Sequence, residues 1–233
     1  MKLLEQDISQ TFNEHYIVET FNLNNKVILE LGCGAASMTQ KIASTGFDRK
    51  VIAYEVDSIQ HEKNIKLKLD NVEFVLCGAQ DIQLEDASVD AIFMFKSFHH
   101  IPKELMTTAL EEVNRVLKPG GLAYISEPLF QGQQNELIAM FHDEEQVRID
   151  AFEAIKDFVE QDKIKLFKEM FFYQESSYKN FADFKNKHMN LSYNDDNISK
   201  TLEGEIKEKY LSFSNKDESA YFLKPFRVDI LQK

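Results

Sequence analysis

Short apolar runs alternate with helix-like stretches along the first half of the chain. Five runs have the length of β-strands: residues 27–31, 51–57, 71–76, 88–95 and 122–126. Between them lie stretches with helical spacing or composition, at residues 38–43, 58–69 and 105–117. Continuous apolar runs are typical of strands that are buried on both faces, as in parallel sheets. We therefore predict an α/β fold with a doubly wound, mostly parallel seven-stranded sheet, helices on both faces and a helical cap.

The N-terminal end and the second half of the chain are predicted to add helices and two late strands. Helical patterns occupy residues 8–21, 131–161, 178–189 and 199–211, and residues 142–145 divide the second of these into two helices. Residues 165–174 and 221–231 suit strands. Pro225 lies inside the last of them, which favours an edge or bulged strand. Residues 194–197 are predicted to form a turn.

The first apolar run ends in a glycine-rich turn, Glu30-Leu31-Gly32-Cys33-Gly34. Glycine lets the backbone turn sharply and approach a ligand closely, and the helix behind the turn offers unpaired N–H groups. Ser37 replaces the third glycine of the dinucleotide fingerprint, which weakens a nicotinamide or flavin interpretation. Glu30 would repel a pyrophosphate but attract an ammonium group. The turn therefore favours a nucleoside ligand that carries an amine.

Net charge narrows the classes of partner. The chain has 233 residues and a net charge of −12, which disfavours nucleic acid and anionic membranes because both require a basic surface. Residues 1–7 lack the apolar core of a signal peptide, and no apolar run approaches the length of a membrane span. The two cysteines, Cys33 and Cys77, suit a reducing compartment. We expect a cytoplasmic monomer or homodimer that binds neither nucleic acid nor membranes.

Taken together, the motifs resemble those of the class I S-adenosylmethionine-dependent methyltransferases. Residues 30–34 resemble that family's first motif, E/D-x-G-x-G, and Glu55-Val56-Asp57 resembles its second. The helix over 105–117, the sequence Lys118-Pro119-Gly120-Gly121 and the strand after it form a third landmark. The resemblance covers residues 26–128 and implies a Rossmann-like fold. It also implies methyl transfer from S-adenosylmethionine to a small molecule, with nitrogen or oxygen as the favoured nucleophile.

By this resemblance, several segments hold the cofactor. Glu55 follows Gly34 at about the 20-residue spacing at which an acid after the second strand binds ribose hydroxyls. Gly78 stands where the family often carries an Asp that accepts the adenine amino group, so the Ala79 backbone and the side chain of Gln80 or Asp81 are alternatives. The expected cofactor residues are Tyr16 on a lid helix, Glu30, Gly32, Gly34, Glu55, Val56 against the adenine face, Ala79, Gln80 and Phe95.

The loop after the fourth strand carries the candidate chemistry. Residues 96–102, Lys-Ser-Phe-His-His-Ile-Pro, resemble the paired-histidine loop of many small-molecule methyltransferases, and they lie where ligands of open α/β sheets collect. The loop lacks D/N-P-P-Y/F, the signature of enzymes that methylate amino groups of nucleic-acid bases. We predict His100 and Glu127 as the candidate catalytic bases. The expected substrate-binding residues are Phe12, His99, Phe130, His142, Arg148 and Tyr173.

Residues 142–148 allow competing interpretations. His142-Asp143-Glu144-Glu145 would suit a metal ion only beside a second cluster at ligand spacing, and because the sequence shows none we expect no metal. Arg148 either pairs with a neighbour on the helix surface or reaches a substrate carboxylate. Glu127 either orients a substrate amine or is a solvated acid at the end of a strand.

We expect a single domain in several parts. These are a lid helix at 1–25, a cofactor-binding core at 26–130, substrate-cap insertions at 131–162 and 176–215, and late antiparallel strands at 163–175 and 219–232. Three alternatives remain for the function. They are a nicotinamide-dependent oxidoreductase, an enzyme that uses a modified adenosylmethionine, and a non-catalytic protein that binds S-adenosylmethionine.

Overall fold

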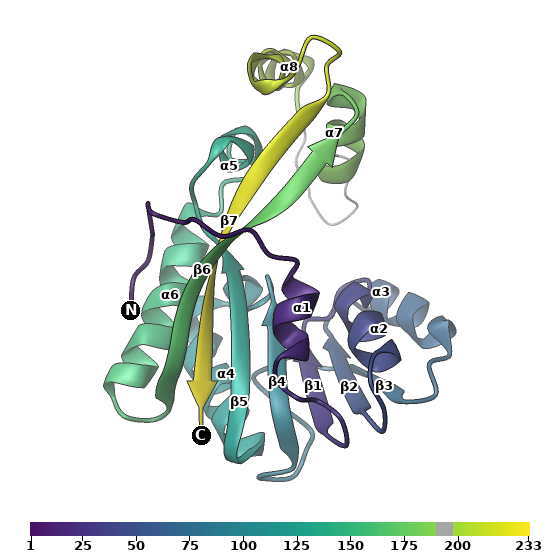
Figure 1. Ribbon diagram of the computed structural model, residues 1–233, viewed down its shortest axis with the longest axis vertical. Coiled ribbons are helices and arrows are strands. Elements are labelled where there is room, and N and C mark those ends of the chain that lie inside the picture. Colours follow the sequence, from purple (N-terminus) through teal and green to yellow (C-terminus); the bar gives the residue numbers. More distant parts are fainter. Residues whose placement is uncertain (190–197) are drawn as a thin grey trace.

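A seven-stranded sheet forms the centre of the computed structural model, which describes residues 1–189 and 198–233 (Figure 1). The strand order is β3-β2-β1-β4-β5-β7-β6. Strands β1 to β5 pair in parallel, whereas β7 runs antiparallel to both β5 and β6. The prediction of a mostly parallel α/β sheet is confirmed.

The elements follow the predicted order. The strands are β1 Val27–Leu31, β2 Lys50–Glu55, β3 Val72–Leu76, β4 Val89–Phe95, β5 Leu117–Pro128, β6 Lys165–Tyr178 and β7 Ala220–Gln232. The helices are α1 Glu14–Glu19, α2 Ser37–Ser44, α3 Ser58–Asn64, α4 Lys103–Val116, α5 Gln133–Ile138, α6 Glu145–Glu160, α7 Phe181–His188 and α8 Lys200–Phe213. Short 3-10 turns occupy η1 Ile65–Leu67 and η2 Phe98–His100.

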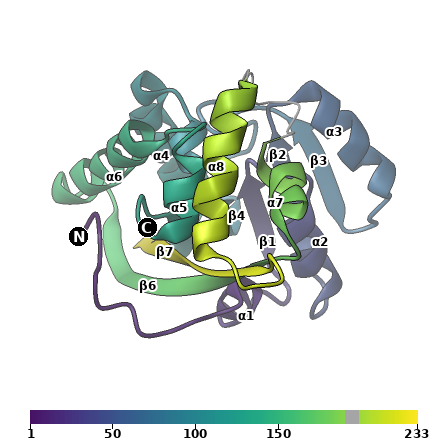
Figure 2. The ribbon, with the colours of Figure 1, turned by 90° about the horizontal axis from the view of Figure 1, so that it is seen from above.

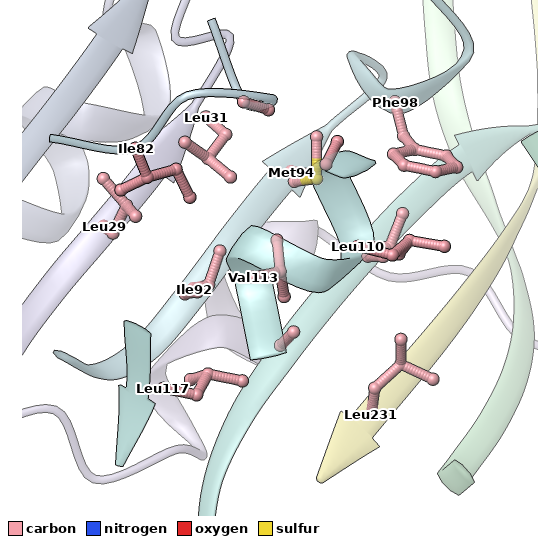
Figure 3. Packing of buried hydrophobic residues seen from close by; sticks show 14 of the residues in the cluster. Leu29, Leu31, Ile82, Ile92, Met94, Phe98, Leu110, Val113, Leu117 and Leu231 are labelled. Atoms are coloured by element: carbon pink, nitrogen blue, oxygen red, sulfur yellow. The ribbon is translucent and has the colours of Figure 1, made fainter. Parts of the chain in front are cut away.

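Helices cover both faces of the sheet, and β4 shows why. Successive side chains of a strand point to opposite faces, so Ile92 and Met94 join the core under α4 and α6, while Phe93 and Phe95 join the core under α1 and α2. Figure 3 shows Leu110 of α4 in the first of these clusters, with Ile92 and Met94. The two cores fix the sheet so that the carboxyl ends of β1, β2 and β4 lie at one edge.

The β6–β7 hairpin extends beyond the other strands and carries a small core of its own. Helices α5, α7 and α8 surround it above the carboxyl edge of the sheet (Figures 1 and 2). Their buried side chains form one apolar cluster with the hairpin, which includes Leu137, Phe184, Ile206, Tyr210 and Phe222. This part of the chain has the position that a cap over the sheet edge requires.

Helix α6 differs from its predicted place in the cap. Its Ala151, Ile155 and Phe158 belong to the main core together with α4. The apolar stripe that suggested a cap helix therefore buries against the sheet layer, and residues 145–160 flank the sheet.

The N-terminal helix is shorter than the predicted 8–21. It begins at Glu14 because the side chain of Asn13 accepts a hydrogen bond from the His15 amide at 3.1 Å. The preceding residues are extended and pair with β6, where the Phe12 amide donates to the Tyr173 carbonyl at 3.0 Å and the Tyr173 amide donates to Gln10 at 2.8 Å. Free backbone groups on the outer side of β6 thus hold these residues out of the helix.

Of the two settings predicted for the last strand, an edge strand or a bulged strand, the edge is wrong, because β7 lies between β5 and β6. Pro225 is tolerated there because the β5–β7 ladder ends at Phe226, opposite Pro128, and does not include Pro225. The Pro225 carbonyl accepts from the Leu129 amide at 2.9 Å, so the proline nitrogen faces the same side, past the end of the ladder. The turn predicted at 194–197 lies outside the described residues. No helix of the described chain is long and apolar enough to cross a membrane.

Candidate functional site

The glycine-rich turn that follows β1 lies at the carboxyl edge of the sheet. Gly32 and Gly34 both have positive φ, of 73° and 51°, a conformation that favours glycine. A Cβ on Gly32 would lie 2.6 Å from the Cβ of Ser97, so glycine lets the loop after β4 pack against the turn. A Cβ on Gly34 would meet nothing within 4 Å. The predicted ligand turn therefore has one glycine that packs against protein and one that faces open space.

Glu30 lies beneath this turn, with only 2% of its surface exposed. Its Oε2 accepts a hydrogen bond from Thr39 Oγ1 at 2.6 Å. Burial, reinforced by the nearby carboxylates of Glu14 and Glu55, raises the pKa of Glu30 to about 8. A cationic group placed beside Glu30 would favour its ionised form, so the chemistry of this position fits the ammonium group of an amino-acid ligand.

Glu55, at the end of β2, joins its own loop to the glycine turn. Its Oε2 accepts from the Gly34 amide at 2.7 Å, and its Oε1 accepts from the amides of Val56 and Asp57 at 2.9 and 3.0 Å. A carboxylate has about four acceptor positions, so these contacts leave room for a hydroxyl donor. Val56, next to it, is 69% exposed.

The loop after β3 shows how the chain differs at Gly78. A Cβ on this glycine would lie 2.3 Å from Oε1 and 2.6 Å from Nε2 of Gln80. The carboxamide of Gln80 therefore lies over the space that a side chain at residue 78 would need. Of the alternatives at this loop, the Gln80 carboxamide lies nearest to Gly78, and Ala79 is buried beside it.

Helix α1 turns a carboxylate inward, and Tyr16 outward. Tyr16 is 71% exposed, whereas Glu14 is buried. Glu14 accepts hydrogen bonds from the Tyr124 hydroxyl at 3.1 Å and from Gln174 Nε2 at 2.8 Å. Glu14 was not predicted, because the helix expected over residues 8–21 placed Tyr16 toward the site.

His99 and Glu127 form a buried pair at the ends of η2 and β5. His99 Nδ1 contacts Glu127 Oε2, and Glu127 Oε1 accepts from the Phe98 amide at 2.9 Å. Burial alone would lower the pKa of His99, but Glu127 and Glu144 outweigh it and raise that pKa to about 9. Charge from His99 likewise outweighs burial and lowers the pKa of Glu127. The Glu127 carboxylate is therefore paired with His99 and buried, which excludes the alternative of a solvated acid at the end of the strand.

His100 stands next to this pair but keeps exposed surface. Its ring centroid lies 4.0 Å from that of His99. Partial burial of the His100 ring, together with the neighbouring His99, lowers the pKa of His100. At neutral pH His100 is accordingly the imidazole of the pair that can accept a proton.

Glu144, at the start of α6, connects the two histidine-containing segments. Its Oε1 lies 3.5 Å from His99 Nε2 and 3.1 Å from His142 Nε2. Its Oε2 contacts Arg148 at 2.5 Å, one helical turn along α6. Arg148 thus has the helix-surface pairing that was one of its two predicted roles. The fold brings further potential metal ligands to Glu144, although none lies near it in the sequence. They are His99 and His100, from the loop after β4.

Two lysines at the same edge lack an acidic partner within the described part of the chain. Lys224 of β7 contacts the Phe226 ring at 5.3 Å, and burial, together with Lys96 and Arg148, lowers the pKa of Lys224 to about 8. Lys96, directly after β4, has a positive φ of 57° and is exposed. Neither lysine was predicted, because only the folded sheet brings β4 and β7 to one place.

The aromatic residues that were predicted to bind cofactor or substrate do not line one common surface. Phe95 is buried and stacks on Phe93 with ring centroids 5.6 Å apart. Phe130 lies under the Arg148 guanidinium at 5.9 Å. Phe12 packs edge-on against Phe172. Tyr173 lines a hollow with Gln131, Tyr221 and Pro225; since neighbours on a strand alternate, it points away from Gln174 and the site.

Comparison with known proteins agrees with this geometry. A family model described as a methyltransferase domain matches residues 28–121. An O-methyltransferase of Aspergillus nomiae is 32% identical over 124 residues, which are 50% of this chain and 53% of that protein. A tRNA N(3)-methylcytidine methyltransferase of Schizosaccharomyces pombe is 29% identical over 49% of this chain and 40% of its own. The chain spans about half, or less, of the length of the curated relatives it matches.

Solved structures share the fold over nearly the whole chain. The YcgJ protein of Bacillus subtilis has a TM-score of 0.65 at 15% identity and covers 94% of this chain and 96% of its own. An S-adenosylmethionine-dependent methyltransferase of Aquifex aeolicus has a TM-score of 0.58 at 18% identity, over 95% of this chain and 90% of its own. The likeness extends through the β6–β7 hairpin, beyond the residues that the family model matches.

Proposed function

We propose that this chain, which belongs through residues 28–121 to the methyltransferase-domain family, transfers a methyl group from S-adenosylmethionine to a small molecule. The observation that carries the proposal is the placement of two acids around one glycine turn. Glu30 is buried beneath the turn, and the Glu55 carboxylate accepts a hydrogen bond from the Gly34 amide. Their chemistry suits the two ends of an amino-acid nucleoside, an ammonium group and a ribose diol.

In this proposal each polar residue of the turn has one task. Glu30 holds the ammonium group, with Glu14 adding negative charge nearby. Glu55 accepts the ribose hydroxyls, and the Gln80 carboxamide accepts the adenine amino group. S-adenosylmethionine, when bound, supplies a methyl group that its sulfonium already activates. The chain then has to align the acceptor and exclude water.

The acceptor would lie between the sheet edge and the hairpin. His100 is the candidate base, because its pKa is lowered and it keeps exposed surface. Glu127 serves as a positioning residue through His99. Lys96 and Lys224 favour an acceptor that carries a carboxylate or phosphate, since neither has an acidic partner in the described chain.

A small molecule is the favoured acceptor class, although one relative is named for a tRNA substrate. A net charge of −12 opposes binding to a polyanion. We further propose a cytoplasmic protein that acts as a monomer or homodimer. The cap that closes over the acceptor would comprise α5, α7 and α8.

Binding of S-adenosylhomocysteine to the purified chain tests the proposal. Calorimetry should give one site per chain, and NADH should give no heat. Glu55→Ala should weaken the affinity about 10- to 100-fold, because hydrogen bonds to charged groups are worth about 1.5–3 kcal/mol each. Glu73→Ala, an exposed acid on the neighbouring strand β3, is the matched control and should change nothing.

Three outcomes discriminate the alternatives. Heat with NADH and none with S-adenosylhomocysteine would favour the oxidoreductase. Mass analysis of the ligand that co-purifies would reveal a modified adenosylmethionine. Binding without formation of S-adenosylhomocysteine, across a panel of carboxylate- and phosphate-bearing acceptors, would favour a non-catalytic binding protein.

A further inference from the structure

Three potential metal ligands converge beside the glycine turn. One nitrogen each of His99 and His100 and one oxygen of Glu144 lie within 4.8 Å of one another. The histidines come from η2 and the glutamate from the residue before α6, so the fold, and not a local motif, assembles the group. We propose that these residues bind a divalent transition-metal ion, with zinc as the best fit.

The donor set decides the class of metal. Two imidazoles and one carboxylate form the ligand set of many catalytic zinc sites, which use three protein ligands and leave a fourth position for water or substrate. Magnesium and calcium prefer oxygen ligands throughout, so two imidazoles argue against both. His142 Nε2 contacts Glu144 Oε1 at 3.1 Å, but His142 does not belong to the group of three ligands.

The contacts around the ligands orient them as a metal site requires. Glu127 holds His99 Nδ1, which turns Nε2 toward Glu144 Oε1 at 3.5 Å. Metal-bound histidines commonly give their second ring nitrogen to a carboxylate in this way. Arg148 holds Glu144 Oε2 at 2.5 Å and leaves Oε1 facing the histidines. Both first ligands are thus fixed from behind by a charged partner.

Charge and burial support the same conclusion. His99 and Glu127 are almost fully buried, and Glu144 is half-buried between His99, His142 and Arg148. A buried ion pair is weak evidence for a gain in stability, because desolvation offsets its attraction. A bound metal ion would account for the buried His99–Glu127 pair, because its positive charge would neutralise the two carboxylates that face His99.

The site lies at the sheet edge where the acceptor is expected. If the proposed methyl transfer holds, the open position of the metal would take an oxygen or nitrogen atom of the acceptor and lower its pKa. His100 would then act as a ligand, and not as a base. This consequence rests on the proposed function, whereas metal binding itself does not.

Zinc titration of the untagged, chelator-treated chain tests the proposal. Calorimetry should give one Zn²⁺ per chain at micromolar affinity or tighter, and Co²⁺ should give the visible absorption of a four-coordinate site. His100→Ala and Glu144→Gln should each weaken binding at least about 100-fold, because even the residues behind the ligands contribute about 10- to 100-fold. Glu127→Gln should fall within that smaller range. His61→Gln, on α3, is the matched control and should bind zinc like the parent chain.

Absence of zinc binding by the parent chain would overturn the proposal, and so would equal weakening by His61→Gln and His100→Ala. His100 is exposed, so its replacement should leave the fold intact, and a thermal melt of each variant verifies this. Titration with S-adenosylhomocysteine in the presence of a chelator separates the two proposals. Nucleoside binding without zinc binding refutes only the metal site, and zinc binding without nucleoside binding refutes only the methyltransferase function.

Discussion

The carboxyl group of Glu30 is buried, and in the described chain its only hydrogen-bond donor is the Thr39 hydroxyl. In this environment the protonated form is favoured, so the pKa of Glu30 rises to about 8. Binding of an ammonium group should reverse that preference. A protonated acid that ionises on binding must release its proton to the solvent, which makes Glu30 observable without a structure of the complex.

We therefore expect proton release when S-adenosylhomocysteine binds at neutral pH. Calorimetry in buffers of different ionisation enthalpy should show close to one proton released per ligand in the parent chain. Glu30→Gln keeps an acceptor for Thr39 but cannot ionise, so it should bind more weakly and release almost none. Equal proton release in both chains would contradict the role of Glu30.

The His99–Glu127 pair predicts a pH dependence of stability. The pKa of His99 is raised from 6.5 to about 9, so the stabilising proton is fully bound in the folded chain below pH 6.5. Stability from this group is then lost as pH rises through 9. The difference in unfolding free energy between the parent chain and His99→Gln should shrink over this range, by an amount on the order of 3 kcal/mol. Urea unfolding at several pH values measures it, and a difference independent of pH would argue against a charged His99.

Residues whose position follows from local spacing could be predicted. Gly32, Gly34 and Glu55 belong to short motifs, and the structure places them around one turn. The contacts of Glu14 and Glu144 could not be predicted. Glu14 accepts a hydrogen bond from a residue more than a hundred positions away, and Glu144 lies against a histidine tens of positions away. A buried acid of this kind leaves no trace in a hydrophobic pattern.

At the scale of elements, apolar periodicity predicted the strands of the core well and the fate of helix faces poorly. The stripe on α6 was predicted to line a cap but packs on the sheet, because periodicity does not say which surface an apolar face meets. Pro225 favours an edge or bulged strand, yet it lies just past the end of the β5 ladder in an interior strand. Pairing partners decide such cases, and a single sequence does not contain them.

The small core of α5, α7, α8 and the hairpin should unfold separately from the sheet. Phe184 is fully buried in this cluster, so Phe184→Ala should cost about 3–5 kcal/mol locally. We expect faster hydrogen exchange in α7 and α8, with binding of S-adenosylhomocysteine unchanged. Leu211→Ala, an exposed position on α8, is the control. Loss of nucleoside binding in Phe184→Ala would show that the cap and the cofactor turn are coupled.

On the scale of the whole molecule, charge is distributed unevenly. The chain carries 39 acidic and 27 basic residues, yet Lys96, Lys224 and Arg148 meet at one edge of the sheet. Net charge could be counted from the sequence and it argued against polyanions. The gathering of these three cations could not be predicted, because they lie on three elements that only the fold brings together.

Residues 10–12 form an isolated parallel bridge on the outer side of β6, where they occupy the backbone N–H and carbonyl groups of Tyr173 that would otherwise be free. Deletion of residues 1–12 should leave that long strand as a template for another chain. We expect the shortened protein to self-associate as concentration rises, visible by light scattering and thioflavin fluorescence, while the full chain stays clear. A shortened chain that remains monomeric would show that pairing by residues 10–12 is not what prevents self-association through β6.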